Sequence, residues 1–321
     1  MKSLPVIIFK GERMGLRIRT NVSSINAQRR LRESTHNLSE SAAKLASGKR
    51  INKAADDAAG LAISANLNAD VRSLNQARRN ALDGVSLVQT TEGGLVETTN
   101  MLTRLRELSI QAASDTIGKT EREFLDKEFL ALKDEIDRIA KSTEFNGLRP
   151  LLGDAAVSEE IANSPGTFPL EIQVGKDYFP LSDSLKEPNP VNIIRADFTR
   201  LNAVTYGENS LNLGQAEEGA RIHEKKAAQN SLTQLDYALT RVNEHRAYLG
   251  AIQNRLTSTI NNLGIQIENL SSAHSRILDT DFAEETANYT SQKILQQAGT
   301  SILAQANTMP EVALNLVNAL G

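Results

Sequence analysis

The side chains that could support catalysis or metal binding are few and widely spaced in this sequence of 321 residues. His223 and Glu224 begin the zinc-protease pattern His-Glu-x-x-His, in which both histidines bind zinc and the glutamate is the general base. The second histidine belongs at position 227, where the sequence has Ala227. The chain has no cysteine, which excludes disulfides, thiolate nucleophiles and cysteine-bound zinc. We therefore expect no catalytic residue, no metal site, no cofactor and no enzyme activity.

Other polar motifs favour structural roles. The Gly-Lys-Arg sequence at residues 48–50 lacks the earlier glycine and the following Ser or Thr of a phosphate loop, and predicts a loop that ends a helix. Asp56 and Asp57 are adjacent carboxylates in a short loop, which cap the next helix more often than they bind a metal. His36 and His245 are expected on solvated faces of helices.

The balance of charges argues against two classes of partner. Lysine and arginine total 36, aspartate and glutamate total 39, and the net charge is −3. The chain therefore presents no bulk positive field that would attract nucleic acid or an anionic membrane. No apolar run approaches the ~20 residues needed to cross a bilayer. We expect neither nucleic-acid binding nor membrane insertion.

A seven-residue apolar repeat predicts the elements that must position these side chains. From Leu67 to Leu102 the repeat predicts a helix over residues 61–113, and from Leu235 to Ile277 it predicts another. Glycines lie inside the first of these helices at Gly84, Gly93 and Gly94. Each glycine costs about 1 kcal/mol relative to alanine, so packing rather than propensity must hold this helix.

A shorter helix is predicted between the two long ones. It is expected to begin after Gly118 with a capping box at residues 120–123, and to stop at the turn dipeptide Asn146-Gly147. The fold class is therefore mainly α, a long antiparallel helical bundle or coiled coil.

A small β element is predicted within residues 150–220, where the apolar spacing changes. Residues 170–174 alternate between apolar and polar side chains, and Gly175-Lys176-Asp177 forms a turn before Tyr178-Phe179, which indicates a β-hairpin. A further short strand is predicted near residues 191–194.

The two ends of the chain carry narrow apolar stripes on otherwise polar helices. The stripe residues are Leu31, Leu38 and Leu45 near the N-terminus, and Leu295, Ile302 and Leu316 near the C-terminus. Neither stripe can bury itself within one helix, so these segments are expected to be largely disordered in a free monomer and to fold when other copies cover them. Such ends are typical of a polymerising subunit.

The first thirteen residues differ in character from the rest. Their apolar stretch is too short for a secretory signal, and no small-residue cleavage site follows it. The codons for Lys10-Gly11-Glu12 can contain a purine-rich ribosome-binding sequence just upstream of Met14. We therefore expect translation to start at Met14 and residues 1–13 to be a misassigned leader.

Several longer motifs resemble bacterial flagellin. They are residues 21–27, 45–60, 83–93 and 145–147 towards the N-terminus, and residues 249–255 and 294–307 towards the C-terminus. Two ordered blocks of matches, which cover most of residues 14–152 and 230–321, make the resemblance specific.

The resemblance implies a subunit of the flagellar filament. Residues 14–59 and 276–321 would form a paired-helix inner domain, and residues 60–275 a helical bundle without the large outer domains of longer flagellins. It also implies unfolded export by the flagellar type III system to an extracellular filament. The implied partners are other copies of the chain, an export chaperone and the export apparatus, and hook-associated and cap proteins.

One surface is implied by the resemblance alone. Arg104, Leu108 and Glu128 match positions that bind the vertebrate innate receptor Toll-like receptor 5, on a face that also packs between neighbouring subunits in the family. An arginine flanked by leucine on an exposed helix face suits such an interface.

Two alternative functions remain open from the sequence. A hook–filament junction protein shares the terminal helices but matches the central motifs less well. A soluble coiled-coil scaffold would have ordered ends in the isolated monomer.

Overall fold

A computed structural model describes residues 20–153, 170–177, 191–198, 201–207, 210–214 and 219–319, with residues 309–319 described as helix without their side chains. The elements are α1 (Val22–Ser47), α2 (Ala58–Ala113), α3 (Lys119–Ser142), β1 (Leu170–Gln173), β2 (Ile193–Ala196), α5 (Lys225–Leu278) and α6 (Phe282–Ala319). They divide into two compact units, one of residues 68–271 and one of residues 1–67 together with 272–321. The predicted leader, residues 1–13, lies outside the described residues.

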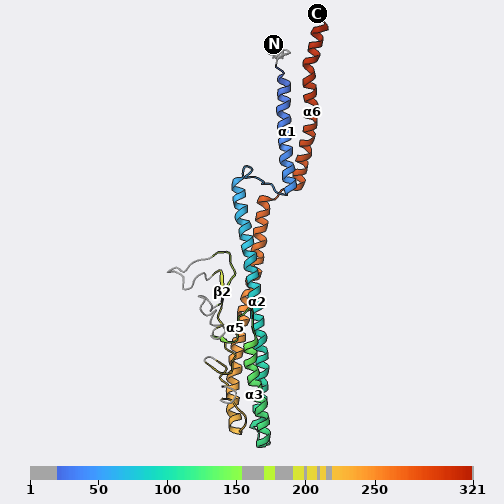
Figure 1. Cartoon of the computed structure of the whole chain (residues 1–321). Coiled ribbons are helices and arrows are strands. Elements are labelled where there is room, and N and C mark those ends of the chain that lie inside the picture. Colours follow the sequence, from blue (N-terminus) through green and yellow to red (C-terminus); the bar gives the residue numbers. More distant parts are fainter. Residues whose placement is uncertain are drawn as a thin grey trace, which may run out of the picture. The chain divides into compact units, whose positions relative to one another are not determined.

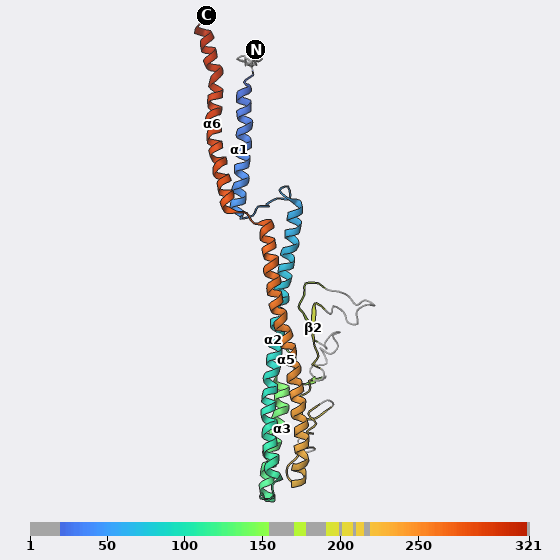
Figure 2. The same cartoon turned by 180° about the vertical axis from the view of Figure 1, so that it is seen from behind.

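In the unit of residues 68–271, the helices α2, α3 and α5 lie side by side (Figures 1 and 2). Arg106 Nε of α2 donates to Asp236 Oδ1 of α5 at 2.9 Å, and Arg122 Nε of α3 donates to Ala112 O at the end of α2 at 2.8 Å. Both neighbours of α2 therefore run antiparallel to it. The predicted mainly helical fold class and the long antiparallel bundle are confirmed.

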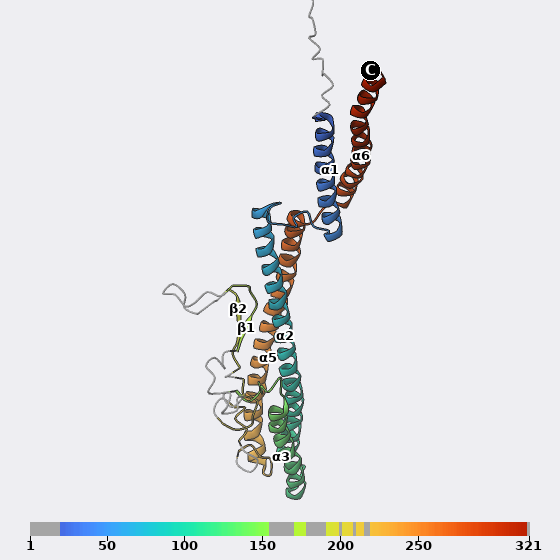
Figure 3. The ribbon, with the colours of Figure 1, turned by 45° about the horizontal axis from the view of Figure 1, so that its top comes forward.

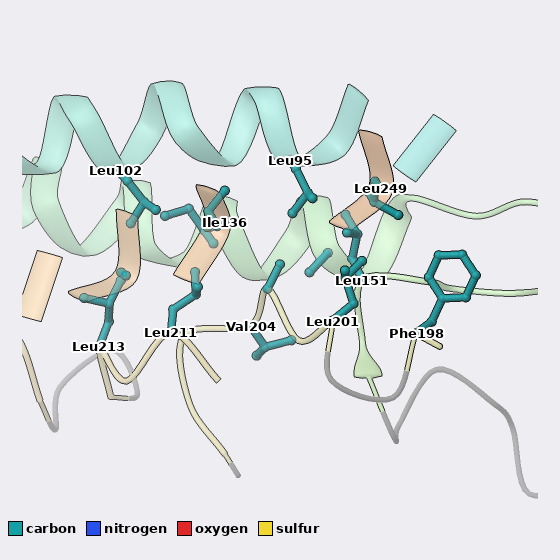
Figure 4. Close-up of a cluster of buried hydrophobic side chains, with 14 of the residues drawn as sticks. Leu95, Leu102, Ile136, Leu151, Phe198, Leu201, Val204, Leu211, Leu213 and Leu249 are labelled. Atoms are coloured by element: carbon teal, nitrogen blue, oxygen red, sulfur yellow. The ribbon is translucent and has the colours of Figure 1, made fainter. Parts of the chain in front are cut away.

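The core of this unit joins the helices to segments without regular structure. Figure 4 shows Leu102 of α2, Ile136 of α3 and Leu249 of α5 close to Leu201 and Leu211 of the chain that leads into α5. These side chains are fully or almost fully buried, and each stabilises the fold by about 1.5–3 kcal/mol relative to an exposed position. The non-helical chain is therefore part of the core.

Gly84 and Gly94, two of the four glycines inside α2, allow segments from farther along the chain to approach the helix closely. A Cβ atom on Gly84 would lie 2.7 Å from Ile172 Cδ1 of β1, and one on Gly94 would lie 2.6 Å from Leu151 Cδ1. By contrast, a Cβ on Gly93 would have nothing within 4 Å. Close packing at Gly84 and Gly94 thus offsets the low helix propensity of glycine.

The start of α3 differs from the prediction. Its N-cap is Gly118, which makes no side-chain cap hydrogen bond, so Thr120 already has helical backbone and its hydroxyl is not in the N-cap position. The predicted capping box is therefore wrong. The turn at Asn146-Gly147 is present, with φ of 49° and 82°, but α3 has already ended at Ser142.

The partner of β1 also differs from the prediction. Figure 3 shows β1 and β2 side by side, and they pair antiparallel with Leu170 opposite Ala196 and Gln173 opposite Ile193. The predicted hairpin partner, Tyr178-Phe179, lies outside the described residues. Alternating apolar and polar residues identify a strand but not the strand that pairs with it. The partner is the second predicted strand, whose Ile193, Ile194 and Ala196 are buried.

Acidic residues of α3 anchor the chain between β2 and α5. Asp126 is 3% exposed and accepts hydrogen bonds from Arg221 Nη2 at 2.7 Å and from Ile222 N at 2.9 Å. Farther along the helix, Asp137 accepts from Thr205 N at 2.7 Å and from its hydroxyl at 3.0 Å. These bonds fix the irregular chain along α3.

Two basic groups are buried in the same unit. Lys133 Nζ donates to Ala220 O at 3.2 Å, and burial is the main cause that lowers the pKa of Lys133. His245 is 7% exposed, so its predicted place on a solvated face is wrong. Among the described residues, its Nε2 has no hydrogen-bond partner. Burial first, and the charge of Arg241 second, lower the pKa of His245 to about 4, against an opposing effect of Glu244.

In the unit formed by the chain ends, a short connector joins α1 to α2. Gly48 ends α1 with a φ of 68°, a backbone conformation that glycine adopts without strain. Arg50 N donates to Leu278 O at 2.7 Å and Thr280 N donates to Gly48 O at 3.1 Å. The predicted helix end at residues 48–50 is confirmed, and it is tied to the junction between α5 and α6.

The two adjacent aspartates of the connector have separate roles. Asp57 Oδ1 accepts from Gly60 N at 2.8 Å, so it caps α2 as predicted. Asp56 Oδ2 accepts from the backbone N–H groups of Asn52 and Lys53, both at 2.9 Å. The bonds from Lys53 and then Asn52 lower the pKa of Asp56, because they stabilise its charged form.

Candidate assembly surface

The terminal helices α1 and α6 lie side by side (Figures 1 and 3). Near the start of α1, Asn21 Nδ2 donates to Ala306 O at 2.7 Å. Farther along α1, Ser34 Oγ donates to Gln292 O at 3.1 Å. Because later residues of α1 contact earlier residues of α6, the pair is antiparallel. The predicted pairing of the terminal helices is confirmed.

The contact between these helices follows a heptad seam, in which the less exposed residues recur at alternating steps of three and four. On α1 the seam residues are Ser24, Ala27, Leu31, Ser34, Leu38, Ser41 and Leu45. On α6 they are Glu285, Tyr289, Gln292, Gln296, Gly299, Leu303 and Ala306. The seam is mainly polar or small on both helices, so the pair buries little apolar surface.

The predicted apolar stripes have different places relative to this seam. Leu31, Leu38 and Leu45 are half-buried members of the seam on α1. Leu295 and Ile302 lie outside it and are 53% and 61% exposed. Leu316 falls where the side chains lie outside the described residues.

Sequence reasoning missed the face of α6 that contacts α1. Large apolar residues identified the exposed column that includes Leu295 and Ile302, whereas the seam beside it contains Gln292, Gln296 and Gly299. The spacing of the seam is a regular heptad, so a search for periodic small and amide residues opposite the leucines of α1 would have found it.

Both terminal helices expose large apolar side chains, Leu295 and Ile302 among them. Those more than half exposed on the described parts of α1 and α6 are Val22, Ile25, Phe282, Ile294, Leu295 and Ile302. Several exposed apolar residues on one pair of helices indicate an interaction surface rather than isolated exposure.

A second surface lies where α2 and α3 meet. Arg104 Nη2 donates to Glu128 Oε1 at 2.8 Å, and Arg104 Nη1 donates to Glu107 Oε2 at 3.1 Å. These bonds, first the one to Glu128 and then the one to Glu107, raise the pKa of the Arg104 guanidinium. The exposed face predicted for Leu108 is wrong, because Leu108 is 0% exposed and belongs to the hydrophobic core. The structure therefore brings Arg104 and Glu128 together at the surface and places Leu108 in the core.

The described part of the chain offers no other chemistry of these kinds. There, no three His, Asp or Glu side chains gather closely enough to hold a metal ion. No helix among the described residues combines the length and the apolar character needed to span a bilayer.

Comparison with known proteins identifies the family. The model of the bacterial flagellin N-terminal helical region matches residues 18–155, and that of the C-terminal helical region matches residues 232–317. A flagellin from Halalkalibacterium halodurans is 38% identical over 94% of this chain and 99% of its own length. The chain belongs to the bacterial flagellin family. That match covers nearly all of both chains over 300 residues. The length of this flagellin, 321 residues, is therefore consistent with a short form of the family.

Other relatives of this flagellin agree. The flagellar filament 30.7 kDa core protein of Treponema maltophilum is 39% identical over 94% of this chain and 99% of the relative. Polar flagellin C of Vibrio parahaemolyticus serotype O3:K6 is 36% identical over 95% of this chain and 100% of the relative. This flagellin is a structural subunit of the extracellular flagellar filament and not an enzyme. A hook–filament junction protein and a soluble scaffold are not favoured.

Proposed function

We propose that this flagellin polymerises through α1 and α6, with residues 14–59 and 276–321 in the inner part of the filament and residues 60–275 in the outer part. The observation that supports this most is the set of large apolar side chains exposed on the two terminal helices, each between 52% and 61%. If other copies cover them, each contributes about 1 kcal/mol, roughly half of what full burial of such a side chain is worth. Several such residues per subunit supply a substantial drive to polymerise.

The direct test replaces apolar surface on α6 by charge. We expect the double variant Leu295→Asp/Ile302→Asp to lose elongation from filament seeds, because an aspartate buried without a partner is strongly disfavoured. Thr300→Asp, at an exposed polar position of the same helix, is the matched control and should still elongate. Circular dichroism should show an intact bundle in both variants. Elongation of the double variant at the wild-type rate contradicts the proposal.

Order in the terminal helices provides a second test. The polar seam between α1 and α6 contains few large apolar residues, so the isolated pair should open readily. We expect limited proteolysis of the monomer to remove both ends and leave a resistant core near residues 60–275, and we expect the filament to resist. Equal protection of the ends in the monomer and the filament would favour a scaffold that does not need polymerisation.

The exposed ion pair of Arg104 with Glu128 is proposed as a second contact between subunits. Both side chains are about half exposed, so a neighbouring subunit can reach them. Arg104→Ala should slow seeded elongation, and Arg138→Ala, which removes an exposed arginine elsewhere on α3, should not. Unchanged elongation of Arg104→Ala argues against this contact.

Recognition by Toll-like receptor 5 in a vertebrate host is a second proposal for the same surface. It is favoured by the exposure of Arg104 and Glu128 side by side, since charged anchors of this kind suit a receptor interface. Reporter cells should respond to wild-type monomer and respond less to Arg104→Ala. A silent wild type ends this proposal without affecting the contact between subunits.

Before assembly, the same apolar residues of α6 need another cover. We propose that an export chaperone binds this face, that the type III export apparatus then transports the unfolded chain, and that hook-associated and cap proteins contact α1 and α6 at the ends of the filament. Leu295→Asp/Ile302→Asp should therefore lose co-purification with the chaperone, whereas Thr300→Asp should retain it. Equal recovery of the chaperone with both variants would place its site elsewhere.

A further inference from the structure

The seam between α1 and α6 has an unusual composition for a pair of helices that must hold one alignment. Its most buried residues on α1 are Ser24, Ser34 and Ser41, which are 6%, 9% and 7% exposed. Serines in these positions let the helices approach but provide little apolar burial. Apolar burial alone therefore distinguishes poorly between alignments of the two helices that differ by one heptad.

One contact in the seam is specific in shape. A Cβ atom on Gly299 would lie 3.3 Å from Leu31 Cδ1, 3.9 Å from Leu31 Cβ and 4.0 Å from Leu31 Cα. Leu31 thus packs directly against the α6 backbone at a residue that has no side chain. Glycine is disfavoured inside a helix, so close approach of Leu31 supplies the physical reason for glycine at this position.

A polar contact lies near the same end of the pair. Ser24 Oγ is 2.7 Å from Asn307 Oδ1 and donates to it, and Ser24 is nearly buried. If α6 slid along α1 by one heptad in one direction, Gln292 would take the place of Gly299 opposite Leu31, and its side chain would push the helices apart. A movement in the other direction would place Ala306 there, and both movements would separate Ser24 from Asn307.

We propose that the Leu31–Gly299 contact and the Ser24–Asn307 hydrogen bond set the register of the α1–α6 pair in the filament. The inference rests on the proposed role of these helices in polymerisation. The contact of Leu31 with Gly299 fixes the distance between the helices, and the hydrogen bond to Asn307 gives the buried hydroxyl of Ser24 an acceptor on the facing helix.

The absence of cysteine from the chain allows the register to be measured directly in filaments. Gln296 Nε2 lies 3.5 Å from Thr35 Oγ1, so the pair Thr35→Cys/Gln296→Cys reports the alignment described here. Thr35→Cys combined with Tyr289→Cys or with Leu303→Cys reports alignments shifted by one heptad in either direction. We expect the disulfide yield within one subunit to be at least about tenfold higher for the first pair than for the other two, because a shift of one heptad moves the two positions about 10 Å farther apart.

The decisive comparison adds substitutions at the specific contact. In the reporter background, Gly299→Leu should reduce the in-register disulfide by about tenfold, because the added side chain overpacks the seam. Leu31→Ala in the same chain should restore it, since the two residues exchange size. Gln297→Leu, at an exposed position on the side of α6 away from both the seam and the column of Leu295 and Ile302, is the matched control and should leave the disulfide yield unchanged.

Three results would overturn the inference: equal yields for in-register and shifted pairs, an unchanged yield with Gly299→Leu, or no restoration by Leu31→Ala. If Gly299→Leu prevents polymerisation, recovery of filaments with Leu31→Ala supports the inference and continued loss overturns it. Failure of the proposed function has a different signature, because Leu295→Asp/Ile302→Asp subunits would then polymerise normally whatever the register.

Discussion

The buried His245 predicts how the helical bundle responds to acid. The unfolded chain takes up a proton on this side chain as the pH falls below about 6.5, the ordinary pKa of histidine. In the folded chain the pKa is about 4, so the folded form stays neutral over that interval. The unfolded state therefore binds more protons between these values, and stability decreases as the pH falls through this range.

The magnitude follows from the separation of the two pKa values. A tenfold difference in proton affinity corresponds to about 1.4 kcal/mol. Protonation of His245 in the unfolded state can therefore lower the free energy of unfolding by about 3 kcal/mol in total. About 2 kcal/mol of this should be lost between about pH 7 and about pH 5. Below about pH 4 both states are protonated and no further loss occurs from this residue.

Urea unfolding of the monomer, followed by circular dichroism at several pH values, measures this effect. His245→Leu should lack the loss because it has no titrating group at that position. His36→Gln is the matched control, since His36 is exposed and paired only with Glu40 on the surface, and it should keep the wild-type slope. Parallel pH profiles for the wild type and His245→Leu would refute the reasoning that His245 is buried in its neutral form.

Further substitutions test the packing of the same unit by urea unfolding. Gly94→Ala should lower the free energy of unfolding by about 1–3 kcal/mol through overpacking against Leu151, whereas Gly93→Ala, with nothing near its Cβ, should raise it by up to about 1 kcal/mol. Equal effects of the two would contradict the assignment of the close contact. Leu102→Ala should lower the free energy of unfolding by about 2–5 kcal/mol by leaving a cavity. A smaller loss would mean that the neighbouring side chains move to fill the cavity. Asp126→Ala should lower it by about 3 kcal/mol, because a buried charge pair and a backbone N–H lose their acceptor; an unchanged thermal midpoint would argue against the anchor.

The long helices could be predicted from the sequence because their cores repeat every seven residues. Leu235, Leu249 and Leu256 are large, aliphatic and fully buried, so the pattern and the packing coincide. Local signals also identified Gly48 and Asp57, since helix ends are specified by residues close in sequence.

Contacts between segments that are distant in sequence could not be predicted as well. The buried Leu201 and Leu211 belong to irregular chain that has no period to read. His245 lies in a column with Ala238 and Ile252, both almost fully buried, but a single polar residue in such a column is easily assigned to the solvent. Burial of this kind depends on chain that packs from far away in sequence.

The candidate assembly surface likewise contains residues that the sequence predicted and residues that it did not. Leu31, Leu38 and Leu45 were placed correctly on one face because they are large and regularly spaced. Gln292 and Gly299 on the facing helix were missed, since amides and glycine carry no hydrophobic signal. Leu108 was taken for a surface residue through the resemblance alone, which carries over a position but not its exposure, and a small rotation around the helix separates an exposed from a buried position.

The antiparallel pairing of β1 and β2 makes this flagellin suitable for displaying foreign peptides. Val174 N donates to Asn192 O at 2.7 Å, so the chain leaves the sheet and returns to it at almost the same point. The entropy lost in closing a loop grows only slowly with its length. A guest sequence grafted between these two residues should therefore leave the helical scaffold intact, and polymerisation would repeat it on every subunit as a regular array.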